Sequence, residues 1–142
     1  FTRRGLVPEA CSTWFLPRIV GIERALRWTL AGQTISAADA LEAGLVSEVV
    51  PKAQVLARAI ELAQEFTHGT APVSVALTRR MMWESLGAQS PQVAHEVESR
   101  ALFSRGQSAD VREGVAAFLE KRSPTFTDTV NGNLPDVFVN DT

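Results

Sequence analysis

The sequence predicts an α+β fold that is mostly helical, and two observations support this. Apolar residues recur at helical spacing through most of the 142 residues. Only one short segment, residues 45–50, has the β-branched composition of a strand, and Pro51 ends it. Because one strand cannot form a sheet, we expect it to pair with residues outside this chain. The apolar helix faces likewise resemble surfaces of a larger core.

Start and stop signals divide the chain into successive helical segments. Pro8 suits a first helical turn, and Pro17 should end or kink the first helix. Gly32 is a good C-terminal stop for the second helix. Ser36 and Ser108 occupy N-cap positions, where a hydroxyl accepts a hydrogen bond from a free helix N–H. The predicted helical segments cover residues 9–16, 22–31, 36–44, 52–66, 72–86, 91–103 and 108–121, and a loop-like tail follows.

Composition excludes several classes of protein. The 14 basic and 16 acidic residues nearly cancel, which argues against nucleic acid or an anionic membrane as a partner. Cys11 is the single cysteine, so no intrachain disulfide can form. No apolar run approaches the roughly 18–20 residues that span a bilayer. We therefore expect a cytoplasmic protein, and the strongly patterned start at Phe1 suggests a piece of a longer one.

Three ordered motifs resemble the crotonase (enoyl-CoA hydratase/isomerase) superfamily. Residues 4–21, RGLVPEACSTWFLPRIVG, resemble the segment that lines the family's active site. Residues 32–46, GQTISAADALEAGLV, resemble the next signature, a capped helix that leads into a strand. Residues 112–122, REGVAAFLEKR, are similar to the closing helix. Each motif alone is weak, but together they cover roughly residues 1 to 123 in the family's order.

The resemblance implies the C-terminal part of a crotonase/ClpP-like spiral of ββα units, together with its helical trimerisation region. Residues 1–51 would end the acyl-CoA-binding spiral core, residues 52–123 would form the oligomerisation region, and residues 124–142 an irregular tail. The subunit would form a homotrimer or a dimer of trimers. The two backbone N–H groups that hold the thioester oxygen would lie before Phe1. Each such donor stabilises the transition state by roughly 3–4 kcal/mol.

Glu9 is the candidate catalytic residue. The run Pro8-Glu9-Ala10-Cys11 is similar to that of family members that shift a double bond from the 3- to the 2-position of an acyl-CoA. In those enzymes a glutamate at this position moves the proton between C2 and C4. From the residues alone, Glu9 better suits a surface cap at a helix N-terminus, where the helix dipole favours a carboxylate. The surrounding family match favours the catalytic role instead.

Phe1 departs from the pattern of the family's hydratases. These enzymes use two carboxylates to activate water, and the second matches the position of Phe1, which cannot move protons. The departure favours isomerase-like chemistry with one carboxylate. A hydratase remains an alternative if a partner carboxylate lies upstream, as do a non-catalytic interaction protein of the same fold and a thioester hydrolase or dehalogenase.

Other candidate residues follow from the same resemblance. Trp14 and Phe15 would line the acyl pocket, with ordinary core packing as the alternative. Phe118 and Lys121 match positions where the closing helix contacts the adenine and phosphates of CoA. The alternative is a core phenylalanine and a solvated lysine near a helix C-terminus. Coenzyme A would be part of the substrate, with no metal or redox cofactor. The histidines lack the spacing of a metal site.

Overall fold

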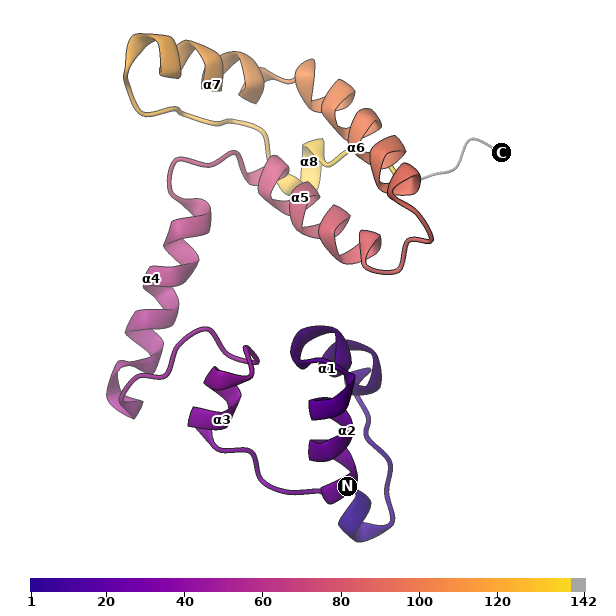
Figure 1. Ribbon diagram of the computed structural model, residues 1–142. Helices are drawn as coiled ribbons and strands as arrows, with labels where there is room; N and C mark the ends of the chain where they lie inside the picture. Colours follow the sequence, from indigo (N-terminus) through magenta and orange to yellow (C-terminus); the bar gives the residue numbers. More distant parts are fainter. Residues whose placement is uncertain (139–142) are drawn as a thin grey trace. The chain divides into compact units, whose positions relative to one another are not determined.

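The computed structural model describes residues 1–138 (Figure 1). The chain divides after Arg58, within one helix, into two compact units. The prediction of mostly helical structure is confirmed. The elements are η1 (Thr2–Arg4), α1 (Ser12–Val20), α2 (Ile22–Ala31), α3 (Ala37–Glu42), η2 (Lys52–Gln54), α4 (Val55–Thr67), α5 (Pro72–Ser85), α6 (Pro91–Gly106), α7 (Ala109–Glu120) and α8 (Val130–Asn133).

In the first unit, η1 is fastened to the C-terminal end of α2. Thr2 Oγ1 donates a hydrogen bond to the Thr29 carbonyl at 3.0 Å, and Arg3 Nε donates to the Ala31 carbonyl at 2.9 Å. Gly32 ends α2 as predicted, with φ of 58°. A Cβ at this position would lie 2.7 Å from Thr2 Oγ1. Gly32 is therefore required both by its left-handed backbone and by the close approach of η1.

The first helix differs from its prediction at both ends. It begins at Ser12, after Cys11, so Pro8 and Glu9 precede it instead of forming its first turn. It also continues through Pro17 to Val20. Proline removes one backbone donor from a helix, and here the remaining turns of a short helix continue past that loss. Pro17 therefore does not end the helix.

The predicted strand at residues 45–50 is wrong for this chain, since these residues form bends and coil and no strand occurs within residues 1–138. The N–H of Leu45 instead donates to the Ala40 carbonyl at 2.8 Å, closing the end of α3. A strand needs a neighbouring chain segment for its backbone groups, and residues 1–138 supply none. The Ser36 cap of α3 is confirmed, because its Oγ accepts from the Asp39 N–H at 3.1 Å.

The second unit is built on a hairpin of α5 and α6, with α8 against α5 (Figure 1). The tail reaches this hairpin, because Arg100 Nε donates to the Val137 carbonyl at 2.9 Å and the Arg80 guanidinium lies 4.0 Å from the centre of the Phe138 ring. The last residues of the predicted tail, 139–142, lie outside the described residues. The core consists of buried Leu77, Ala101 and Val137, against which Met81, Val97 and Phe138 pack.

Helix α7 follows α6 closely. Ser108 caps it as predicted, since its Oγ accepts from the Val111 N–H at 3.1 Å. The helix ends at Glu120, and Lys121 adopts a left-handed backbone with φ of 54°. Helix α6 continues to Gly106, past its predicted end at residue 103, because Gly106 keeps a helical backbone instead of serving as a stop.

Both units leave large apolar side chains exposed, in agreement with the expectation that the helix faces belong to a larger core. The exposed residues include Leu6, Val7, Ile22, Leu30, Leu56, Phe66, Leu102, Phe103 and Phe118.

Within residues 1–138, none of the helices combines the length and hydrophobicity that crossing a bilayer requires.

Candidate functional site

Glu9 lies in a tight turn with an unusual backbone. The two residues that follow it, Ala10 and Cys11, both have positive φ, at 54° and 56°. Left-handed backbone is unfavourable for residues with a Cβ by roughly 1–2 kcal/mol each. Ser12 secures the turn, because its N–H and its hydroxyl both donate to the Glu9 carbonyl, at 3.1 and 2.7 Å. Strained turns of this kind cluster at functional sites.

The Glu9 side chain is exposed and makes no hydrogen bond or ion pair with residues 1–138. Its neighbours Pro8 and Ser12 line a small hollow of about 200 Å³ in the first unit, which Glu9 itself does not line. Phe1 lines the same hollow. The described residues thus hold the Glu9 backbone firmly and leave its carboxylate exposed.

Trp14 and Phe15 project from the first turn of α1. Their rings meet edge to face, with centroids 4.8 Å apart and an interplanar angle of 81°. The Arg18 guanidinium covers the Trp14 ring at 4.0 Å, a cation–π contact. The two aromatic residues are 36% and 40% exposed. Both lie on the short helix that follows the Glu9 turn.

Phe118 and Lys121 lie at the end of α7, in the second unit. Phe118 is 82% exposed, more than any other large apolar residue within residues 1–138. Lys121 is exposed and occupies the left-handed position that ends the helix. An exposed aromatic ring one turn before an exposed ammonium is able to contact an aromatic base and phosphates.

Two acidic residues of α7 hold the chain that follows it. The pKa of Glu113 is lowered to about 2, first by hydrogen bonds from Arg122 and then by the Thr125 N–H. The ion pair raises the pKa of Arg122. Asp110 is only 3% exposed, and its Oδ1 accepts from the N–H groups of residues 127 and 128. Sequence reasoning missed these carboxylates, although Glu113 lies inside the closing-helix motif.

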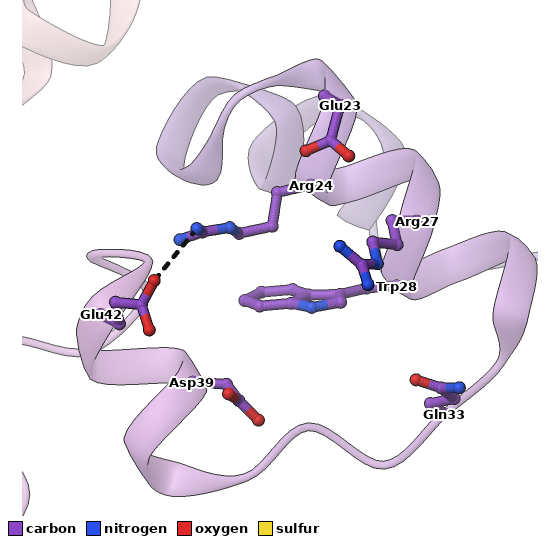
Figure 2. Close-up of a pocket in the computed structure, with 7 residues that line it drawn as sticks. All are labelled: Glu23, Arg24, Arg27, Trp28, Gln33, Asp39 and Glu42. Atoms are coloured by element: carbon purple, nitrogen blue, oxygen red, sulfur yellow. Dashed lines mark hydrogen bonds and ion pairs between the residues drawn. The ribbon is translucent and has the colours of Figure 1, made fainter.

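A polar hollow of about 300 Å³ lies between α2 and α3 (Figure 2). Arg24 spans it to reach Glu42, with Nη2 3.4 Å from Oε1, and the Trp28 indole lies across its middle. Its charges are mixed, with three carboxylates against two guanidinium groups, so it does not favour an anion such as a phosphate. The lining residues are Glu23, Arg24, Arg27, Trp28, Gln33, Asp39 and Glu42.

The second unit contains a more apolar hollow of about 500 Å³ between α5 and α6. Buried Leu77 and Ala101 form part of its lining, as does His95.

Within residues 1–138, no three histidine, cysteine or acidic side chains gather as metal ligands would. Cys11 is a free, exposed thiol in the Glu9 turn.

The comparisons with known proteins identify the family. The family model for enoyl-CoA hydratase/isomerase matches residues 1–129, so the chain belongs to this family. The enoyl-CoA hydratase ACTT3 of Alternaria alternata is 44% identical over 132 residues, which cover 92% of this chain and 44% of that protein. The 1,2-epoxyphenylacetyl-CoA isomerase of Escherichia coli is 37% identical, covering 89% of this chain and 48% of the relative.

Solved structures agree in fold. The enoyl-CoA hydratase of Mycobacterium tuberculosis superposes with a TM-score of 0.82 at 33% identity, covering 89% of this chain and 50% of that one. The enoyl-CoA hydratase of Bacillus anthracis gives a TM-score of 0.81 at 32% identity, covering 88% and 48%. The chain thus spans about half the length of the relatives that it matches, and the resemblance seen in three motifs is confirmed at the level of the family.

Proposed function

We propose that the protein containing this chain isomerises enoyl-CoA thioesters, with Glu9 as the proton carrier. The observation that carries the proposal is the Glu9 turn. Two consecutive left-handed residues follow Glu9, and Ser12 secures its carbonyl with two hydrogen bonds. The surrounding structure maintains this strained backbone, and the turn leaves the Glu9 carboxylate exposed. An exposed carboxylate in a fixed position suits a group that must exchange protons with a substrate.

The reaction needs one base that becomes the acid. The Glu9 carboxylate removes a proton from C2 of a 3-enoyl-CoA, and the electrons of that C–H bond form a dienolate with its negative charge on the thioester oxygen. The protonated Glu9 then delivers the proton to C4, and the double bond settles between C2 and C3. Backbone donors from residues upstream of Phe1 would stabilise the oxyanion. Metal or redox chemistry has no part in this sequence of steps.

The remaining expected residues take supporting roles in this proposal. Trp14 and Phe15, on the helix that follows the turn, would contact the acyl chain. Phe118 and Lys121 would contact the adenine and phosphates of CoA. The proposed assembly is a homotrimer or a dimer of trimers, as the family resemblance implies, and the proposed location is the cytoplasm, which the single cysteine suits.

A Glu9→Gln substitution tests the catalytic role. Gln cannot take up a proton but keeps the shape of the side chain, so kcat for conversion of 3-enoyl-CoA to 2-enoyl-CoA should fall roughly 10²- to 10⁴-fold. Glu23→Gln, which removes an exposed carboxylate of α2 in the same unit, is the matched control and should keep wild-type activity. Full activity of the Glu9 variant would show that another group carries the proton.

Hydration of 2-enoyl-CoA is the second candidate, and the hydratase name of the 44% identical Alternaria alternata relative favours it. The two reactions give different products from the same 2-enoyl-CoA. Hydration yields a 3-hydroxyacyl-CoA with the mass of one added water, whereas isomerisation leaves the mass unchanged. Mass spectrometry of the product decides between them, because only hydration adds the mass of water. Phe1 supplies no second carboxylate, so a hydratase would need one from elsewhere in the protein.

A further inference from the structure

The chain that leaves α7 is fastened back onto that helix. Residues 123–129, which we call the strap, run beside α7 (Figure 1). At the first attachment, Glu113 accepts two hydrogen bonds from Arg122, at 2.6 and 2.9 Å, one on each oxygen. The Thr125 N–H donates to the same carboxylate at 2.7 Å. One side chain in the middle of α7 therefore fixes both the end of the helix and the start of the strap.

The second attachment is buried. Asp110 Oδ1 accepts from the N–H groups of Thr127 and Asp128 at 2.9 and 3.1 Å. Arg105, at the end of α6, donates to Asp128 Oδ2 at 2.6 Å and lies 3.6 Å from Asp110 Oδ2. Between the two attachments, the Phe126 ring lies against Gly114. The strap, α6 and α7 are thus joined by a connected set of charged groups.

The end of α7 would not adopt its conformation without support. Lys121 takes the left-handed position that usually belongs to glycine, and the Arg122 N–H donates to the Ala117 carbonyl at 3.0 Å. For a lysine this backbone is unfavourable, so neighbouring contacts must determine it. The adjacent Arg122 supplies such contacts, because Glu113 accepts two hydrogen bonds from it and Glu120 accepts a third at 2.6 Å.

We propose that Glu113 is a positioning residue that, through Arg122 and the strap, orients Lys121 and Phe118 toward the nucleotide end of CoA. This proposal rests on the proposed function, which assigns those two residues to CoA. Glu113 does not itself touch the substrate. The paired, two-point geometry of Arg122 on a carboxylate fixes the direction of the guanidinium, beyond any contribution that the ion pair makes to stability. The geometry therefore points to an orienting role for Glu113 in addition to its contribution to stability.

A pair of substrates separates orientation from stability. An enoyl-CoA and the matching enoyl-pantetheine carry the same reacting group, but the second lacks the adenosine diphosphate part. In the full-length protein, Glu113→Gln should raise KM for enoyl-CoA by roughly threefold to thirtyfold. The value of kcat, and kcat/KM for enoyl-pantetheine, should stay unchanged.

Further variants complete the design. Arg122→Lys keeps the charge but loses the two-point contact with Glu113 and should act in the same direction. Because Arg122→Lys also loses the Nε hydrogen bond to Glu120, its effect on KM should be at least as large as that of Glu113→Gln, and adding Glu113→Gln to it should change little. Glu84→Gln, which removes one member of the exposed Arg80–Glu84 pair on α5, is the control for loss of a surface carboxylate and should have no effect on either substrate.

The outcomes distinguish the inference from its basis. If Lys121→Ala raises KM for enoyl-CoA but Glu113→Gln and Arg122→Lys do not, the positioning role is wrong and the proposed function stands. If Glu113→Gln impairs both substrates equally, the strap serves stability alone and the inference is overturned. Failure of the proposed function would appear differently, as a wild-type protein that turns over neither thioester.

Discussion

At the scale of single residues, the candidate site is a contrast between a rigid backbone and an open side chain. The left-handed pair Ala10 and Cys11 fixes the Glu9 turn, yet the Glu9 carboxylate has no described partner. Sequence identified Glu9 through its motif, but it could not foresee the turn, because neither alanine nor cysteine signals a positive φ. Glycine is the usual signal for that backbone.

Glu113 gives a prediction for the dependence of stability on pH. Its folded-state pKa of about 2 lies below the ordinary value of 4.5, chiefly because Arg122 donates to it. The unfolded chain therefore binds this proton first as the pH falls. The stabilisation is complete above pH 4.5 and is lost between 4.5 and about 2. Glu48, whose pKa Arg58 lowers by hydrogen bonding, contributes with the same sign.

Urea unfolding at successive pH values measures this effect. The wild-type protein should lose free energy of unfolding more steeply than Glu113→Gln as the pH falls from 4.5 toward 2. Above pH 4.5 the two pH profiles should run parallel, since the carboxylate is then ionised in both states. Parallel profiles over the whole range would mean that Arg122 does not stabilise the charged form of Glu113.

At the scale of elements, Gly32 joins α2 to η1 and carries a second prediction. A Gly32→Ala substitution should reduce the free energy of unfolding by about 1–3 kcal/mol. Alanine is strained at φ of 58°, and its Cβ would lie 2.7 Å from Thr2 Oγ1. Loss of that contact should also loosen η1 and the segment before Glu9, which limited proteolysis near residues 2–5 would detect.

Gly106 provides the matched control for this prediction. It lies in α6 with a helical backbone, and a Cβ there would meet no atom within 4 Å. Gly106→Ala should therefore stabilise the protein by up to about 1 kcal/mol, since alanine favours a helix over glycine. Equal effects at both positions would show that the closeness of η1 to Gly32 has no energetic consequence.

The elements also show which sequence signals suffice. Ser36, Ser108 and Gly32 marked helix boundaries correctly, because capping is decided by residues a few positions apart. The strand at residues 45–50 failed, because pairing depends on a partner distant in sequence or absent from the chain. The strap was also missed: its two attachments join residues that are 9–23 positions apart, beyond the reach of any local pattern.

At the scale of the whole molecule, the main property of the chain is the apolar surface that it leaves uncovered. Among the residues that the structure describes, Val73 and Leu77 are the largest fully buried side chains, whereas larger ones such as Phe103 and Phe118 are mostly exposed. Soluble monomers seldom expose extensive apolar surface, and such surface marks places where other polypeptide belongs. The relatives, about twice as long, have the additional chain that could cover these faces.

Solution behaviour should reflect this incomplete burial. Residues 1–142 expressed by themselves should bind a fluorescent apolar dye strongly and self-associate, because the exposed helix faces have no partner. A longer protein that includes this chain should bind little dye and unfold cooperatively. Dye fluorescence and sedimentation velocity of the two proteins at equal concentration make the comparison. A monomeric, dye-free chain of 142 residues would show that its exposed leucines and phenylalanines need no cover, and the assignment of these faces to a larger core would then be wrong.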